Sequence, residues 1–189
     1  MMTTEQKGRI HPYKFTLWVA LGSIVMMFAG FTSAYIVKRN QTNWQGFDLP
    51  MIFTYSTVII LVSSVTMQLA VRRFKERRMD VYRRMMLVTA ILGIAFIAMQ
   101  WTGFGMLANN GIKLVGAGSN VAGSFLAVIA GVHMAHVLGG VIALLWMFKR
   151  AFSSRSRTYS PVGIEVAATY WHFVDILWIY LFIFLKVVS

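Results

Sequence analysis

The sequence predicts an all-α fold, a polytopic membrane protein built as a bundle of five transmembrane helices. Of its 189 residues, 58% are hydrophobic and only 13% are charged. The mean hydropathy is +0.65, and apolar runs of about twenty residues, the length that crosses a bilayer, recur along the chain. Only three prolines interrupt these runs, which favours a single membrane domain over residues 1–189.

Five spans follow from the hydropathy in chain order. The first is preceded by Lys7, Arg9 and Lys14, as in a signal peptide. Its apolar run is too long for one and no convincing cleavage site follows, so we expect a retained helix. The short connections leave no room for a folded extramembrane domain. The expected ranges are 15–37, 51–71, 85–108, 121–148 and 164–188.

The basic residues predict the orientation of the bundle. Five spans place the N-terminal tail and the second and fourth connections on one side of the membrane. That side would hold 14 of the 18 lysines and arginines, with three, seven and four residues in the three segments. By the positive-inside rule, the N-terminus is expected in the cytoplasm and the C-terminus outside. The basic run from Arg72 to Arg78 is therefore interpreted as a topology signal, and no nucleic-acid partner is expected.

Three ionisable residues in the last span form a polar stripe. A charged Asp at the centre of a membrane helix costs roughly 2.5 to 3.5 kcal/mol, so such groups normally face protein and pair there. At about 100° per residue, Glu165, His172 and Asp175 fall within about 80° of one another. We therefore expect all three side chains to face one neighbouring helix.

Other polar residues are few in the expected spans. His133 and His136 share a face of the fourth span, because they are three residues apart, and Gln100 lies near the middle of the third. The second span carries four polar residues that we expect to serve packing, the Ser and Thr hydroxyls returning hydrogen bonds to their own helix. They are Ser63, Ser64, Thr66 and Gln68.

Three hypotheses compete for these polar side chains. The favoured one is a structural polar core, in which His133 or His136 pairs with Glu165 or Asp175 across two helices. The second is a metal or haem site in a stand-alone membrane protein; with no cysteine in the chain, its ligands would have to be His and carboxylate. The third is a proton or ion path in a small carrier. We predict no catalytic, cofactor-binding or metal-binding residue, and a structural core of His133, His136, Glu165, His172, Asp175 and Gln100.

Two motifs carry a resemblance to a known family. The last span reads Gly-Ile-Glu-Val-Ala-Ala-Thr-Tyr-Trp-His-Phe-Val-Asp from Gly163 to Asp175, followed by Ile-Leu-Trp. The fourth span reads Gly-Val-His-Met-Ala-His-Val from Gly131 to Val137. Both resemble the matching helices of subunit III of the haem-copper cytochrome c oxidases, in the five-helix bacterial form.

The resemblance implies a subunit without a redox centre of its own. Such a subunit packs against oxidase subunit I, holds structural phospholipid between its helices and supports proton uptake, while haem and copper lie in partner subunits. The complex, in the bacterial inner membrane, would pass electrons from cytochrome c, or from quinol in sister oxidases, to dioxygen and translocate protons. It would work in the aerobic respiratory chain, within a possible supercomplex.

The chain departs from the family pattern at two acidic positions. Ile24 stands where many members carry a Glu in this helix, and Gly103 stands where the third of these helices often has another Glu. A proton-handling role for either position therefore does not carry over.

Overall fold

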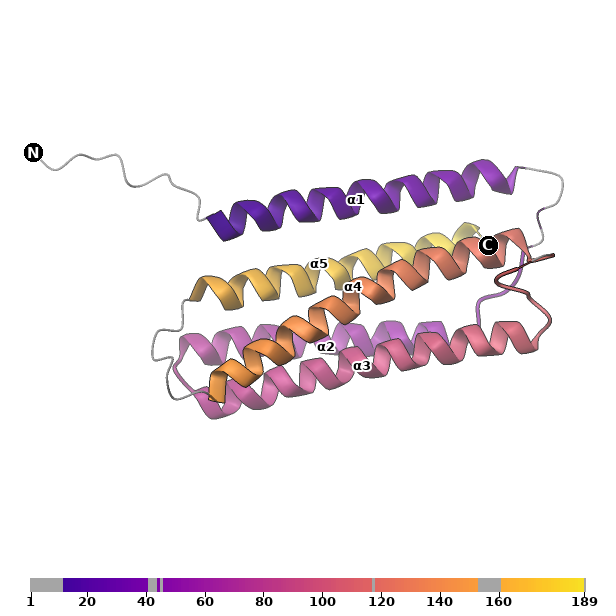
Figure 1. Ribbon diagram of the computed structural model, residues 1–189. Coiled ribbons are helices and arrows are strands. Elements are labelled where there is room, and N and C mark those ends of the chain that lie inside the picture. Colours follow the sequence, from indigo (N-terminus) through magenta and orange to yellow (C-terminus); the bar gives the residue numbers. More distant parts are fainter. Residues whose placement is uncertain (1–11, 41–43, 45, 117, 153–160, 189) are drawn as a thin grey trace, which may run out of the picture.

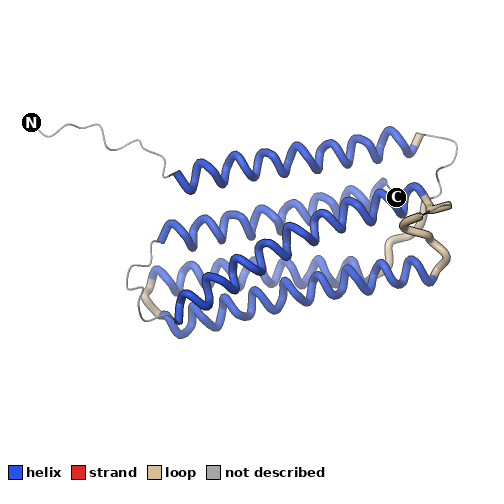
Figure 2. Tube along the Cα trace, in the orientation of Figure 1, coloured by secondary structure: helices blue, strands red, loops and turns tan. Residues whose placement is uncertain are grey.

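Every regular element in the described part of the chain is an α-helix, which confirms the predicted fold class (Figures 1 and 2). The computed structural model describes residues 12–40, 44, 46–116, 118–152 and 161–188. The helices are α1 (Pro12–Arg39), α2 (Ile52–Lys75), α3 (Met79–Asn109), α4 (Val121–Phe152) and α5 (Pro161–Val188).

The observed helices run beyond most of the ranges expected from hydropathy. α3 begins at Met79 rather than at residue 85, and α2 ends at Lys75 rather than at residue 71. Hydropathy ends a span where charge begins, but long basic side chains can reach water from helical positions, so the helix continues. Met51, expected inside the second span, lies just before α2. All five helices are long and apolar enough to cross a membrane, and the chain is a multi-pass membrane protein.

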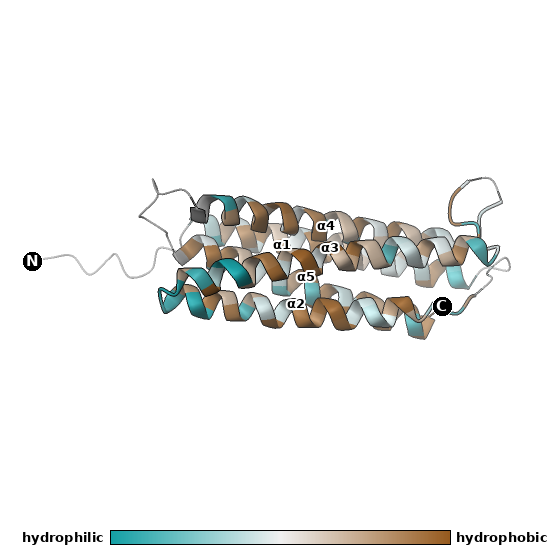
Figure 3. Ribbon diagram, turned by 90° about the horizontal axis from the view of Figure 1, so that it is seen from below, coloured by the Kyte–Doolittle hydropathy of each residue, from teal (hydrophilic) through white to brown (hydrophobic). Residues whose placement is uncertain are grey.

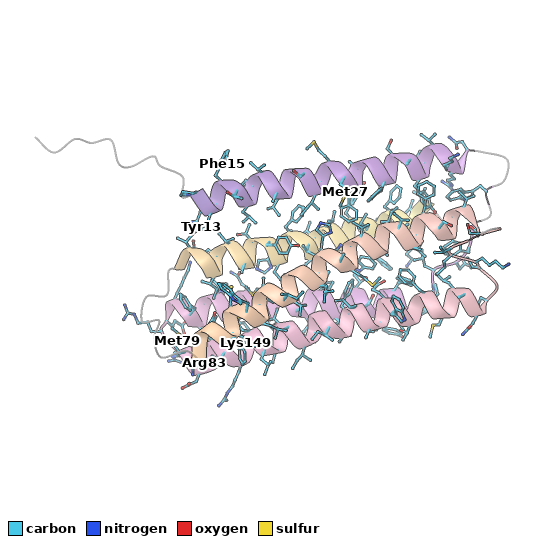
Figure 4. The ribbon with its side chains drawn as sticks, viewed as in Figure 1. Tyr13, Phe15, Met27, Met79, Arg83 and Lys149 are labelled. Carbon is cyan, nitrogen blue, oxygen red and sulfur yellow. The ribbon has the colours of Figure 1, made fainter. Side chains whose placement is uncertain are left out.

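One end of the bundle gathers basic side chains. Figure 4 places Tyr13 of α1, Met79 and Arg83 of α3 and Lys149 of α4 at this end, and Figure 3 shows hydrophilic residues at the turn from α2 to α3. In that turn Arg77 has φ 58°, and the Arg78 amide donates to the Arg73 carbonyl oxygen at 3.0 Å, as in a helix-ending Schellman motif. We call this end of the bundle, where α1 begins, α2 ends, α3 begins and α4 ends, the basic end.

Trp171 of α5 packs among three other helices. A Cβ atom built on Gly93 of α3 would lie 2.8 Å from Cη2 of the indole, and one built on Gly140 of α4 would lie 3.0 Å from its Cζ3. Only glycine leaves room for the ring at both positions. The indole nitrogen meanwhile reaches α2, so this buried side chain contacts three helices.

α1 is the least covered helix. It contacts α4 and α5 but neither α2 nor α3, and in Figure 1 it lies along one side of the other four. Only 17% of its most apolar stretch is buried, against 33% to 44% in the other helices. Figure 4 shows Phe15 pointing away from the bundle and Met27 pointing toward it. Most of the buried hydrophobic side chains therefore come from α2, α3, α4 and α5, and α1 adds Leu21, Phe28 and Tyr35.

Candidate functional site

Side-chain hydrogen bonds join α5 to α2 along their length. Near the end of the bundle opposite the basic end, the Trp178 indole N–H donates to the Thr57 hydroxyl at 3.0 Å. Two turns nearer the basic end, the Trp171 indole N–H donates to the Ser63 hydroxyl at 2.8 Å. Both indoles thus satisfy their single donor without water, as a buried Trp requires.

His172 continues this row with a hydrogen bond on each ring nitrogen. Its Nδ1 lies 2.7 Å from the Ser64 hydroxyl, and its Nε2 lies 3.2 Å from Oε1 of Gln68. Closer to the basic end, Glu165 forms ion pairs with Lys75 of α2 at 3.3 Å and with Lys14 of α1 at 3.1 Å.

From the start of α5 to its end, the bonding partners on α2 run from Lys75 to Thr57, toward lower residue number, as expected for two antiparallel helices. Along α5 the contacting residues repeat every seven positions, about two helical turns, and so stay on the side toward α2: Glu165 with His172, and Trp171 with Trp178. The stripe expected on the last span therefore exists, and the neighbour it faces is α2. We call this row the α2–α5 seam: Thr57, Ser63, Ser64, Gln68 and Lys75 with Glu165, Trp171, His172 and Trp178.

The hydroxyls of α2 serve two partners at once. Ser56 and Thr57 both donate to the Phe53 carbonyl oxygen at 2.8 Å, as expected for hydroxyls that return to their own helix. Each also accepts a hydrogen bond from another helix, Ser56 from Gln100 and Thr57 from Trp178. A hydroxyl carries one donor and two acceptor lone pairs, so both bonds fit. In the second-span group expected to serve packing, Thr66 returns a hydrogen bond to its own helix. The other three residues of that group, Ser63, Ser64 and Gln68, bond to side chains of α5.

The structure does not bring together the predicted His–carboxylate pairs. Glu165 bonds to lysines rather than to a histidine. His136 places its Nδ1 2.8 Å from the carbonyl oxygen of Val132, one turn back in the same helix. For Glu165 the physical reason is its position along the bundle, since it lies at the basic end, whereas the two histidines lie in the middle of α4.

His133 is enclosed by aromatic rings. It is fully buried, and neither ring nitrogen has a hydrogen-bond partner among the described residues. The Trp178 ring stacks on it at a centroid distance of 5.0 Å, and Phe96 and Phe28 meet it edge-on at 5.8 and 6.3 Å. A neutral imidazole packed in this way behaves as another ring of the core.

Asp175 is the most isolated of the predicted residues. Its side chain is buried at 2% exposure, and neither carboxyl oxygen makes a hydrogen bond within the described part of the chain. Asp175 lies three residues after His172 on α5, so its carboxyl group shares the face of the helix that forms the α2–α5 seam.

Gln100 connects α3 to α2 rather than to the titratable residues. Its Nε2 donates to the Ser56 hydroxyl at 2.8 Å. One turn further along α3, a Cβ atom on Gly103 would lie 2.8 Å from the Phe53 ring. Phe53 thus fills the space in which an acidic side chain at position 103 would begin.

No group of three or more His, Cys, Asp or Glu side chains converges among residues that the structure describes. The seam contains donors and acceptors already matched to one another, which is the arrangement of a helix-joining network. Sequence analysis missed Thr57, Gln68 and Lys75 as partners. The sequence does contain a signal for these partners. Gln68 and Lys75 are seven residues apart, which is the separation of His172 and Glu165, and they occur in the opposite order along the chain.

Fold and seam together define a polytopic membrane protein in which polar side chains join the helices to one another. A family model described as cytochrome c oxidase subunit III matches residues 37–189. The protein named "Probable cytochrome c oxidase subunit 3" from Nocardia farcinica is 31% identical over 187 residues, covering 92% of this chain and 90% of the relative. The cytochrome c oxidase subunit 3 of Corynebacterium diphtheriae is 33% identical over 180 residues, covering 87% and 85%. That of Bacillus sp. (strain PS3) is 26% identical over 170 residues, covering 87% and 80%.

The chain belongs to the cytochrome c oxidase subunit III family. It is a haem-copper oxidase subunit III and a member of an oxidase complex, which confirms the resemblance that the two motifs indicated. The alternative of a quinol oxidase subunit is not favoured, because these relatives are named as cytochrome c oxidase subunits.

Proposed function

We propose that this chain is the non-catalytic subunit III of a bacterial cytochrome c oxidase. In this role it packs directly against subunit I in the inner membrane, and haem and copper lie in the partner subunits. It supports the stability of the complex and its proton uptake during reduction of dioxygen to water.

The use of the polar side chains in the bundle supports this proposal. His133 is stacked among rings, and His136 bonds to its own helix. His172 has both ring nitrogens engaged by α2. Because the three described imidazoles are committed to packing or to helix-joining bonds, a scaffold suits them better than a ligand set does.

The test is gentle extraction of the chain with an affinity tag at its N-terminus from native membranes. We expect haem, copper and a large polytopic subunit to accompany it, with oxygen consumption driven by reduced cytochrome c. A lone chain carrying near-stoichiometric metal, lost on His133→Ala, would contradict the proposal. Activity with quinol and none with cytochrome c would contradict the assigned donor.

We also propose that the basic end faces the cytoplasm. Support comes from the basic side chains that α1, the α2–α3 turn and α4 bring to this end. Because the chain has no cysteine, a single introduced cysteine reports its own location. In sealed inside-out vesicles, Arg78→Cys should react with an impermeant maleimide and Val115→Cys, in the α3–α4 loop, should not. The reverse pattern would overturn the orientation.

We propose that structural phospholipid binds in a cleft at the basic end. The cleft has a volume of about 420 Å³ and lies among α1, α2 and α5. Lys14 and Lys75 line the cleft, and their ammonium groups, which also pair with Glu165 there, carry the positive charge that would attract a phosphate. Leu17, Trp18 and Val71 offer apolar contact to acyl chains. The complex with Lys14→Ala and Lys75→Ala should retain less anionic lipid than one with Lys186→Ala, a lysine of α5 that does not line the cleft. Equal lipid content would contradict this placement.

A further inference from the structure

The cleft at the basic end contains an amide group whose hydrogen-bond donors are not used by the bundle. Gln68 of α2 lines the cleft, together with His172 of α5. Oε1 of Gln68 lies 3.2 Å from Nε2 of His172, and this is the one side-chain hydrogen bond that Gln68 makes to a described residue. A glutamine amide has two N–H donors as well as its oxygen. Both donors are therefore available to a group inside the cleft.

His172 fixes the orientation of this amide. An amide oxygen only accepts, so Nε2 of His172 carries the proton and donates it to Gln68. The other nitrogen of a neutral imidazole is then an acceptor, and the Ser64 hydroxyl donates to Nδ1 at 2.7 Å. Because its oxygen is held by His172, the Gln68 amide directs its nitrogen away from that ring. The row of Ser64, His172 and Gln68 thus ends in N–H groups that need an acceptor.

The position of Gln68 along α2 indicates which acceptors can reach it. Arg72, the first basic residue of α2, follows four residues later, about 6 Å along the helix axis. The headgroup layer on one side of a bilayer is roughly 5 to 8 Å thick. Gln68 therefore lies where headgroups give way to hydrocarbon, which is the level of the acyl ester groups. Unpaired N–H donors are costly at that depth, which favours a bound acceptor.

The rest of the cleft suits a lipid that meets Gln68 in this way. Leu17, Val71 and Val166 line the cleft and offer apolar contact to hydrocarbon chains. Lys75, seven residues beyond Gln68, lies about 10 Å nearer the basic end. A phosphate near the Lys75 ammonium group is therefore on the water side of Gln68. The amide then lies beside the part of the lipid that joins its headgroup to its chains.

We propose that Gln68 binds a carbonyl oxygen of a lipid held in this cleft, with His172 as its positioning residue. This contact rests on the proposed lipid cleft and adds specificity to it. Two kinds of membrane molecule offer such an oxygen: a phospholipid in its acyl esters, and a quinone in its ring. Either accepts a hydrogen bond from the Gln68 amide N–H. A phospholipid with ether-linked chains has no such oxygen.

Competition between ester-linked and ether-linked phosphatidylglycerol tests this subsite. The two lipids share a headgroup and a chain length, and only the ester form has carbonyl oxygens. The intact oxidase complex is exchanged into an equimolar mixture, and mass spectrometry measures the bound lipid that is lost in Lys14→Ala, Lys75→Ala. In the wild type we expect the ester form to exceed the ether form about two- to tenfold, the effect of one net hydrogen bond. Gln68→Leu should abolish that preference, and the wild-type ratio itself is decisive where this variant yields too little complex.

His172→Phe tests the positioning role. Without the imidazole the Gln68 amide is free to turn, so we expect a smaller preference for the ester form at an unchanged total of bound lipid. An unchanged preference would remove His172 from the proposal. A wild-type complex without ester preference that holds a quinone, lost in Gln68→Leu, would assign the carbonyl oxygen to the quinone ring.

Thr169→Val is the matched control. Thr169 also lines the cleft, but its hydroxyl donates to the Glu165 carbonyl oxygen at 2.8 Å, so we expect the wild-type preference. Equal loss of preference in Thr169→Val and Gln68→Leu would overturn the subsite. Equal retention of the two lipids by the wild type, with no quinone that depends on Gln68, would overturn it and leave the lipid cleft in place. Absence of any lipid that depends on the two lysines would overturn the cleft and the subsite together.

Discussion

α5 meets its neighbours α2 and α4 with different chemistry. Toward α2 it presents indole, imidazole and carboxyl groups, each matched by a hydroxyl, amide or ammonium group. Toward α4 it presents ring faces, with Trp171 against Gly140 and Trp178 stacked on His133. The first interface is specified by donors and acceptors, and the second by shape. The same residue type, histidine, therefore has opposite roles in the two interfaces.

The largest expected effect comes from a substitution that disrupts the interface between α4 and α5, which is specified by shape. Gly140→Leu places a Cβ atom 3.0 to 3.2 Å from the rings of Trp171 and Tyr170, and the rest of the side chain must then displace them. We expect a loss of about 3 kcal/mol in the free energy of unfolding, measured by denaturing-detergent titration of the full chain in mixed micelles. Gly139→Leu is the control, because nothing lies within 4 Å of its Cβ position. Equal losses in the two variants would show that the Gly140 contact is not specific.

Substitution of His172 or of His133 is expected to have an intermediate effect on stability, and the two effects should differ in size. His172→Phe leaves Ser64 and Gln68 without their partner, so we expect a loss of about 1 to 2 kcal/mol in the same titration. His133→Phe removes no hydrogen bond to a described residue and keeps a ring beside Trp178, so we expect a change of about 1 kcal/mol or less. A larger loss in His133→Phe than in His172→Phe would reverse the comparison.

The smallest expected effect lies at the exposed end of the seam. Lys14→Ala breaks one of the two ion pairs of Glu165, in which the Lys14 and Glu165 side chains are 46% and 33% exposed. Exposed pairs contribute about 0 to 1 kcal/mol, and salt should reduce that contribution further. The difference between wild type and Lys14→Ala should therefore shrink when the titration is repeated at high salt. A difference that grows with salt would indicate a role other than the ion pair.

Periodicity predicted the helices and the α5 stripe, because both depend on the chain's own repeat. It could not identify the partner of the stripe. Pairing between ionisable groups favours the titratable residues of α4 as partners. The partners turned out to include Ser64 and Gln68, whose uncharged groups meet the same need. Which helix lies beside α5 depends on packing, notably on Trp171 fitting over Gly93 and Gly140, and that fit is a property of three helices together.

The contacts of α1 have a consequence for biosynthesis. α1 packs only against α4 and α5, which leave the ribosome after α2 and α3. About 80 residues separate the end of α1 from the start of α4, so at about 5 to 20 residues per second α1 waits roughly 4 to 16 s for its first partner. Of the five helices described, α1 is translated first but gains its packing partners only when α4 and then α5 have been made.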